Sequence, residues 1–159
     1  MTAGRIALAS EHAGFALKES LKAYLTRQGF SIADCGAASP EPVDYPPIAE
    51  KLALGVLSGA FEKGVLICGT GIGMSIAANK VPGIRAALCA DLLQARYTRL
   101  HNDANILCLG AWITGERLAQ DIAYTFLTTG FEGGRHIPRL DMIADIEKAA
   151  GYRLTGIQS

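Results

Sequence analysis

A glycine-rich loop that follows an apolar run is the segment of the chain best suited to chemistry. Residues 64–80 read GVLICGTGIGMSIAANK, so the apolar run ends at Cys68 and glycines follow at positions 69, 71 and 73. A strand, a glycine loop and a helix in this order direct several free backbone N–H groups at one point, which favours negative charge there. A thiol at the edge of such a loop is well placed to ionise. The segment predicts a cradle for an oxygen anion, with Cys68 beside it as a nucleophile or base.

Other uses of glycine-rich loops fit this segment less well. A dinucleotide-binding loop has the pattern Gly-x-Gly-x-x-Gly after the first strand, whereas this loop follows the third expected strand and has Met at position 74. A P-loop ends in Gly-Lys-Ser/Thr, which is absent here. A cysteine phosphatase would need an arginine about where Met74 stands. A simple tight turn is the alternative without a function, and the cradle is the favoured interpretation.

Three histidines and two arginines are the other candidate groups. His12, His101 and His136 each have polar neighbours in the sequence, although a lone histidine is usually structural or exposed. Arg135 and Arg139 lie four residues apart at the start of an expected helix, so they share one face. That pair is either a solvated basic edge or a clamp for phosphate or carboxylate.

The elements that must position these residues alternate between apolar runs and helical patterns. The expected strands are Arg5–Ser10, Phe30–Asp34, Val65–Cys68, Arg85–Ala90 and Ile106–Gly110. The expected helices are Ala13–Gln28, Pro47–Ser58, Ser75–Lys80, Asp91–His101, Gly115–Thr128 and Pro138–Ala150. This alternation predicts a parallel sheet with helices on both faces.

Ligands of such sheets bind at the carboxyl ends of the strands. We therefore expect the segments 10–12, 44–45 and 68–74 to meet at one edge of the sheet. The segment His101-Asn102-Asp103 lies between a helix and the fifth strand, so it falls at the opposite edge of its own subunit. It is expected to serve a site on a neighbouring molecule.

Composition narrows the classes of function. Of the 159 residues, 50% are hydrophobic and 19% charged, which indicates surface hidden in an oligomer. Lys+Arg and Asp+Glu both number 15, so nothing indicates a nucleic acid or an acidic membrane as partner. The four cysteines lack metal-ligand spacing, and no signal peptide is visible. Free thiols in a cytoplasmic protein are the expectation.

Six segments together resemble the type B ribose-5-phosphate isomerases and their galactose-6-phosphate and allose-6-phosphate relatives. The matching segments are 11–15, 44–46, 67–73, 75–80, 101–103 and 132–136, in the right order along nearly the whole chain. The resemblance implies one Rossmann-like three-layer α/β/α domain over residues 1–159, with a five-stranded parallel sheet and a C-terminal helix. It also implies a homodimer or a tetramer with shared active sites, a phosphorylated sugar as substrate, an enediolate intermediate, and neither metal nor cofactor.

Roles follow from the resemblance residue by residue. Cys68 would move a proton between C1 and C2, Thr70 would assist proton exchange among the oxygens, and His101 of the partner subunit would open the sugar ring. Backbone N–H groups of the loop would stabilise the enediolate, and such donors contribute ~3–4 kcal/mol each. The loop residues implied are Gly69, Gly71, Ile72, Gly73 and Met74. The residues implied in binding are His12, Arg135 and Arg139 for phosphate, Asn102 for a substrate oxygen, and Tyr45 for the wall of the sugar pocket.

Two positions depart from the family pattern. The family usually has Asp before the first-loop histidine, whereas Glu11 would carry its carboxylate ~1 Å or more further into the substrate pocket. The family often has an arginine in the loop after the fifth strand, and Trp112 in that loop cannot replace its charge. Met74 stands where another branch has a glutamate, so the chain groups with the cysteine branch.

The sequence thus predicts a sugar-phosphate aldose–ketose isomerase, with ribose 5-phosphate and ribulose 5-phosphate as the first candidates. A tetrose phosphate or a hexose 6-phosphate is the alternative, and Glu11 and Trp112 favour five carbons or fewer. A non-catalytic sugar-phosphate-binding subunit is another possibility, against which the presence of Cys68, Thr70 and His101 argues. A nucleotide-binding module is disfavoured by the glycine spacing.

Overall fold

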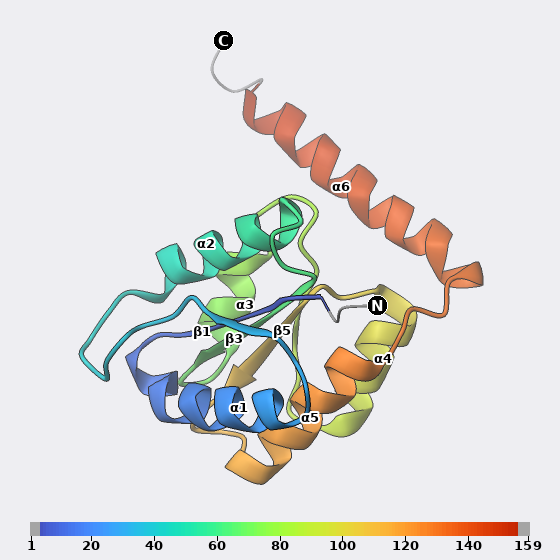
Figure 1. Cartoon of the computed structure of the whole chain (residues 1–159). Coiled ribbons are helices and arrows are strands. Elements are labelled where there is room, and N and C mark those ends of the chain that lie inside the picture. The colour runs from blue at the N-terminus through green and yellow to red at the C-terminus, as the bar shows by residue number, and fades with distance from the viewer. Residues whose placement is uncertain (1–3, 156–159) are drawn as a thin grey trace.

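A parallel five-stranded sheet forms the centre of the protein in the computed structural model, which describes residues 4–155 (Figure 1). The strands are β1 (Ile6–Ser10), β2 (Ile32–Asp34), β3 (Lys63–Cys68), β4 (Ala86–Leu88) and β5 (Ile106–Gly110). Their order across the sheet is β2-β1-β3-β5-β4, and every neighbouring pair is parallel. The expected Rossmann-like architecture is confirmed.

Helices cover both faces of the sheet. The helical elements are η1 (His12–Gly14), α1 (Phe15–Arg27), α2 (Tyr45–Leu57), α3 (Ile72–Ala78), α4 (Leu92–Asn102), α5 (Glu116–Thr128), η2 (Gly134–His136) and α6 (Ile137–Thr155). Helices α1, α4 and α5 lie on one face, and α2 and α3 lie on the other (Figure 1). Strands β1 and β5 are buried along their whole length and β3 from Gly64 onward, as is typical of parallel strands that are covered on both faces.

Alternation along each strand divides the core into two parts. On β1, Leu8 belongs to the same buried cluster as Leu21 of α1 and Phe126 of α5. Its neighbour Ala9 points to the other face and belongs to a cluster with Leu52 of α2. Cys68 lies on this second face, so the strand pattern turns its side chain toward α2 and α3.

Two helices begin two or three residues earlier than the sequence pattern indicated. Helix α3 starts at Ile72 rather than Ser75, because Gly71 adopts the left-handed conformation (φ 80°) and allows the chain to turn directly into the helix. Helix α2 starts at Tyr45 rather than Pro47. A proline in the first turn has a fixed φ near the helical value and no N–H that the helix would need, so Pro46 fits there.

The C-terminal helix α6 is longer than expected and runs from Ile137 to Thr155. It extends away from the three layers (Figure 1). One tie to the body is a hydrogen bond from the Gly83 N–H to Glu147 Oε2, at 3.0 Å. Met142 and Ile146 are exposed on this helix. These apolar side chains are therefore free to contact another molecule.

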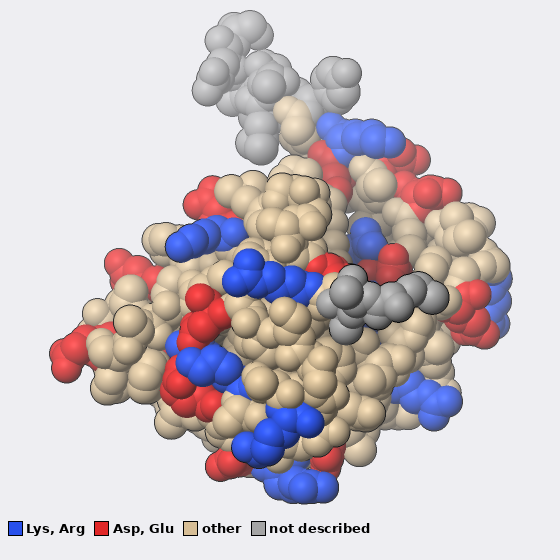
Figure 2. Space-filling model, viewed as in Figure 1, with Lys and Arg blue, Asp and Glu red and all other residues tan. Residues whose placement is uncertain are grey.

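Charged residues of both signs intermingle on the face that Figure 2 shows. Within residues 4–155, none of the helices combines the length and apolar character needed to cross a membrane.

A buried lysine joins α1 to the end of β2. The Lys18 side chain is 2% exposed, and its Nζ donates to both carboxylate oxygens of Asp34, at 2.8 and 2.7 Å. Lys22 Nζ also donates to Asp34, at 2.8 Å. Partial burial alone would raise the pKa of Asp34, but the hydrogen bonds from the two lysines outweigh it and hold that pKa below its usual value.

We expect Asp34→Asn to lower the free energy of unfolding by about 1–3 kcal/mol at pH 7, because it weakens charged hydrogen bonds to a buried ammonium. A depressed carboxyl pKa stabilises the fold above the unfolded pKa and loses that effect as the pH falls through the folded value. The difference between wild type and variant should therefore shrink below about pH 3.9. Urea unfolding across pH measures it. Asp121→Asn, which removes an exposed ion pair with Arg117, should change stability little, and equal effects of the two variants would contradict the assignment.

Candidate active site

The loops after β1 and β3 meet where the chain reverses its direction across the sheet. From β1 the chain moves to one side to form β2 and then to the other side to form β3. Open α/β sheets bind ligands in the crevice at such a point, beyond the carboxyl ends of the strands. The two segments are in close contact, because a Cβ on Gly14 would lie 2.8 Å from the Ile67 side chain.

The loop after β3, predicted as an anion cradle, joins the strand to α3 and has a cysteine at its start. Cys68 is 6% exposed, and its Sγ accepts a hydrogen bond from the Gly71 N–H at 3.2 Å. Thr70 Oγ1 accepts from the Ile72 N–H at 3.3 Å, which leaves the Thr70 hydroxyl hydrogen to donate elsewhere. The first hydrogen bond of the helical pattern in α3 runs from Ser75 N–H to Gly71 O. The Gly71 and Ile72 N–H groups, both predicted as cradle donors, are already engaged by the Cys68 and Thr70 side chains. The next two N–H groups, of Gly73 and Met74, have no acceptor within the helix and are available to a substrate oxygen.

Tyr45 closes one side of the cradle. It is the first residue of α2, and a Cβ on Gly73 would lie 2.9 Å from its ring. Only glycine at position 73 lets the ring lie this close to the loop. Trp112 lies on another side of the cradle. Its backbone N–H donates to Gly69 O at 2.8 Å, and 73% of the residue is exposed. Two exposed aromatic side chains thus border the loop.

Glu11 and His12 follow β1 at the same edge. Glu11 is buried, and its Oε1 accepts from the Gly14 N–H at 3.0 Å while its Oε2 lies 2.9 Å from His12 Nδ1. The longer carboxylate is therefore engaged within its own loop, and it does not extend freely into the pocket as the sequence comparison with Asp had indicated. The Val43 N–H also lies 3.3 Å from His12 Nδ1, so that nitrogen can either accept from Val43 or donate to Glu11.

A second polar cluster lies at the end of α4, where η2 and α6 approach it. A cavity of about 310 Å³ is lined by His101, Asn102, Arg135, His136, Arg139, Leu140 and Ile143. Arg139 Nη1 donates to the backbone oxygen of Arg135 at 2.6 Å. The structure therefore brings both predicted arginines together with the predicted histidine and asparagine, four candidates from distant parts of the chain.

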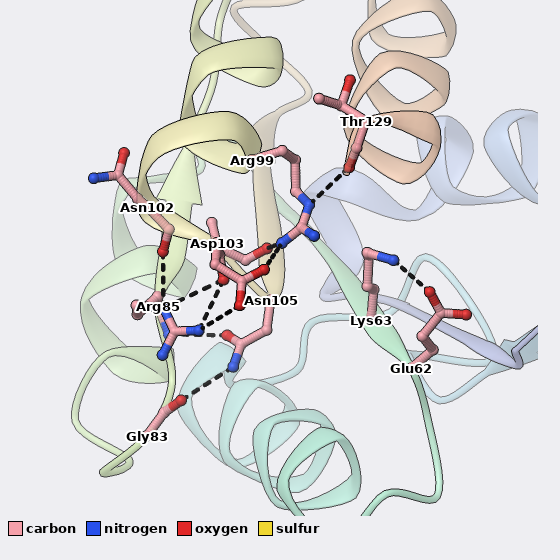
Figure 3. A network of polar contacts seen from close by, with 10 residues as sticks. Glu62, Lys63, Gly83, Arg85, Arg99, Asn102, Asp103, Asn105 and Thr129 are labelled. Atoms are coloured by element: carbon pink, nitrogen blue, oxygen red, sulfur yellow. Dashed lines mark hydrogen bonds and ion pairs between the residues drawn. The ribbon is translucent and has the colours of Figure 1, made fainter. Parts of the chain in front are cut away.

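A network of arginines fixes the end of α4 (Figure 3). Asp103 ends the helix in the left-handed conformation, with φ of 43°. Arg99 Nη1 donates to Asp103 Oδ1 at 2.8 Å, and Arg85 Nε donates to the Asn102 backbone oxygen at 2.9 Å. The Asn102 side chain points away from this network (Figure 3), so it is available to other groups.

The His101 ring is held between two other rings. Tyr97 meets it edge to face with a centroid distance of 4.8 Å, and His136 stacks on it at 4.3 Å with an interplanar angle of 16°. Glu132 Oε2 lies 3.8 Å from His101 Nε2 and 3.3 Å from His136 Nε2. Glu132 and His136 were not predicted as neighbours of His101. Their separation of four residues was the available signal, but only the fold brings them to α4.

Among the described residues, the two clusters line different cavities. The cradle residue Cys68 ends β3 at the carboxyl edge of the sheet, whereas His101 precedes the start of β5 and so lies toward the amino edge. None of the cradle residues lines the cavity beside His101. In one chain, the cradle and the cluster beside His101 therefore lie toward opposite ends of the strands.

The other buried thiols have environments that oppose ionisation. Burial raises the pKa of Cys89 to about 12 and also raises the pKa of Cys108 far above its usual value. These environments are typical of inert core thiols. Cys68 Sγ, by contrast, accepts a hydrogen bond from the Gly71 N–H of the loop.

Comparisons with known proteins show the family to which the chain belongs. Residues 6–143 match the family model described as Ribose/Galactose Isomerase. Ribose-5-phosphate isomerase B of Escherichia coli (strain K12) is 44% identical over 144 residues, which cover 91% of this chain and 97% of that protein. The 4-deoxy-4-sulfo-D-erythrose isomerase of Clostridium sp. (strain MSTE9) is 46% identical over 128 residues, which cover 80% of each.

Solved structures show the same architecture. The structure of Clostridium thermocellum ribose-5-phosphate isomerase B superimposes with a TM-score of 0.90 at 48% sequence identity. The match covers 92% of this chain and 99% of that chain.

Proposed function

The chain belongs to the ribose/galactose isomerase family, and we propose that it interconverts ribose 5-phosphate and ribulose 5-phosphate in active sites shared between two subunits. It is an aldose–ketose isomerase, and this proposal concerns its substrate and the residues that act on it. The observation that carries the proposal is the Cys68 thiol at the edge of a loop of free N–H groups. The loop offers a base and an oxyanion cradle in one place.

The proposed reaction moves one proton along the sugar. Cys68, as the thiolate, removes the proton from C2 of the open-chain aldose and returns it to C1, which yields the ketose. Negative charge develops on the oxygens of the enediolate between these steps, and the N–H groups of Gly73 and Met74 would donate hydrogen bonds to these oxygens. The Thr70 hydroxyl, whose hydrogen is free, passes a proton between the two sugar oxygens.

The second cluster is proposed to act on a neighbouring subunit's substrate. Arg135 and Arg139 would bind the phosphate, together with His12 of the subunit that holds the cradle, and His101 would open the sugar ring. Two features support a shared site: the clusters lie apart in one chain, and α6 carries exposed apolar side chains beyond the body of the subunit. The assembly is proposed to be a homodimer or a tetramer built from such dimers.

A four-carbon substrate is the second candidate. The sulfoerythrose isomerase relative is as similar in identity as the ribose 5-phosphate relative, so overall similarity does not separate them. Trp112 is exposed beside the cradle and brings no positive charge. Its presence favours a substrate whose anionic end needs fewer positively charged partners. An aldose with one anionic end is common to both candidates.

The test is isomerisation assayed over matched sugar phosphates of four, five and six carbons, with free ribose alongside. We expect the highest kcat/KM for ribose 5-phosphate, weak activity on hexose 6-phosphates, and poor activity on free ribose. A higher kcat/KM for the four-carbon sugars would favour the second candidate. A preference for a hexose 6-phosphate, or equal activity on ribose and its phosphate, would contradict the proposal.

Removal of either arginine should weaken the use of phosphorylated substrates. Charge-assisted hydrogen bonds contribute about 1.5–3 kcal/mol, so Arg135→Gln or Arg139→Gln should lower kcat/KM by about 10- to 100-fold. The loss on free ribose should be much smaller, because no phosphate is bound there. Arg27→Gln is the matched control, since Arg27 is an exposed arginine at the end of α1. Equal losses on ribose and ribose 5-phosphate would contradict the phosphate role.

A further inference from the structure

The geometry points to an inhibitory binding site for Zn²⁺ formed by His101, Glu132 and His136. One potential ligand atom from each residue lies within 4.8 Å of the others. Imidazole nitrogens and a carboxylate oxygen are a ligand set that Zn²⁺ prefers, and three protein ligands leave a fourth position for water. The inhibition rests on the proposed role of His101, whereas binding of the ion does not.

His136 provides a second, independent observation. Its side chain is 8% exposed, and its Nε2 is buried with no hydrogen-bond partner among the described residues. Buried polar atoms almost always make a hydrogen bond, and the nearby Glu132 carboxylate does not complete one here, so this nitrogen can still take a partner. That nitrogen lies 3.3 Å from Glu132 Oε2, at the centre of the cluster.

The arrangement of the rings determines which residue must move. Each imidazole offers its lone pair in the plane of its ring, and two rings stacked at 16° cannot both direct a lone pair at one ion. His136 is held by burial, and the Glu132 N–H donates to Leu100 O at 3.1 Å, which anchors Glu132 to α4. His101 is 33% exposed, so its ring has room to turn toward the ion.

Metal binding would therefore withdraw His101 from the reaction in two ways. The ion would occupy the lone pair that exchanges a proton with the sugar ring, and the turn would remove the ring from its position against Tyr97. The blocked step is ring opening of the aldose. Arg135 and Arg139 line the same cavity and repel cations, so the site should select a strong imidazole-binding ion over Ca²⁺ or Mg²⁺.

Binding is tested first without substrate, by calorimetric titration of the metal-free dimer or tetramer with Zn²⁺ in phosphate-free buffer. Glu132→Gln should weaken Zn²⁺ binding at least about 10-fold. Loss of a residue that only supports a metal ligand already weakens metal binding by about this factor. His136→Gln should do the same, with thermal unfolding to show that it is folded. Glu50→Gln, on the exposed side of α2, is the matched control and should leave binding unchanged.

The competing target for the ion is the Cys68 thiol, and Co²⁺ distinguishes the two sites. Co²⁺ bound to the histidine cluster should show ligand-field absorption without a thiolate-to-metal charge-transfer band. A strong charge-transfer band, or Zn²⁺ affinity that is the same in wild type, Glu132→Gln and Glu50→Gln, would overturn the proposal.

Inhibition is then measured in the aldose-to-ketose direction. Zn²⁺ should inhibit the wild type reversibly, with recovery on addition of EDTA, and Glu132→Gln should need at least about 10-fold more Zn²⁺ for the same inhibition. Equal inhibition of both proteins would overturn the inhibitory role. If every sugar phosphate proved inert while the binding results held, the proposed substrate would fail and the metal site would stand.

Discussion

Replacing Cys68 by alanine should abolish isomerisation and leave the fold and the binding of sugar phosphate nearly intact. The change removes the only group that the proposed reaction uses as a base, and such groups contribute about 10²- to 10⁴-fold to the rate. The Sγ accepts one hydrogen bond, from the Gly71 N–H, and the side chain is small, so its loss leaves little space to refill. We expect kcat to fall by at least about 10²-fold in both directions while KM changes little.

The control for this variant is Cys35→Ala, since Cys35 is a partly buried thiol at the end of a different strand. Steady-state kinetics in both directions and calorimetric binding of a sugar phosphate measure the outcome. Near-normal turnover by Cys68→Ala would assign the proton transfer to another residue. Loss of binding together with turnover would indicate that the cysteine supports the loop instead of the chemistry.

Local signals predicted the strand, loop and helix around Cys68 well because these parts are contiguous. The apolar run of β3, the alternating glycines and the helix after them lie within residues 64–80, and the structure places them in that order. The predicted start of α3 was wrong by three residues. A glycine in the left-handed conformation, such as Gly71, can either end a loop or continue it, so the sequence did not show where the helix begins. The positions of Tyr45 and Trp112 beside the cradle were harder to predict, because they depend on contacts between elements far apart in sequence.

The cluster at the end of α4 was only partly predictable for the same reason. The pair Arg135 and Arg139 follows from helical spacing alone. Their position beside His101 depends on how η2 and α6 leave the body of the subunit, and no periodicity encodes that direction. Glu132 joins the cluster through a backbone hydrogen bond to Leu100, which a sequence pattern does not reveal.

Mixing two inactive variants should restore activity if the active site is shared. Cys68→Ala subunits keep the cluster at the end of α4, and His101→Ala subunits keep the cradle. A mixed dimer then combines one intact cradle with one intact His101, while its other site lacks both. Random exchange makes about half of the dimers mixed, so recovery should approach about a quarter of wild-type activity.

The assay must run from aldose to ketose, because a ketopentose 5-phosphate has no free 5-hydroxyl with which to close a five-membered ring and so needs no ring opening. Mass spectrometry of the intact assembly, with one variant isotopically labelled, verifies that subunits exchange. If exchange is confirmed and activity does not exceed the sum of the two variants, the two clusters do not act together in one shared active site. Recovery would instead explain why a single chain keeps His101 and Cys68 at opposite edges of its sheet: each completes a site on the other subunit, so the isolated chain has no complete catalytic centre.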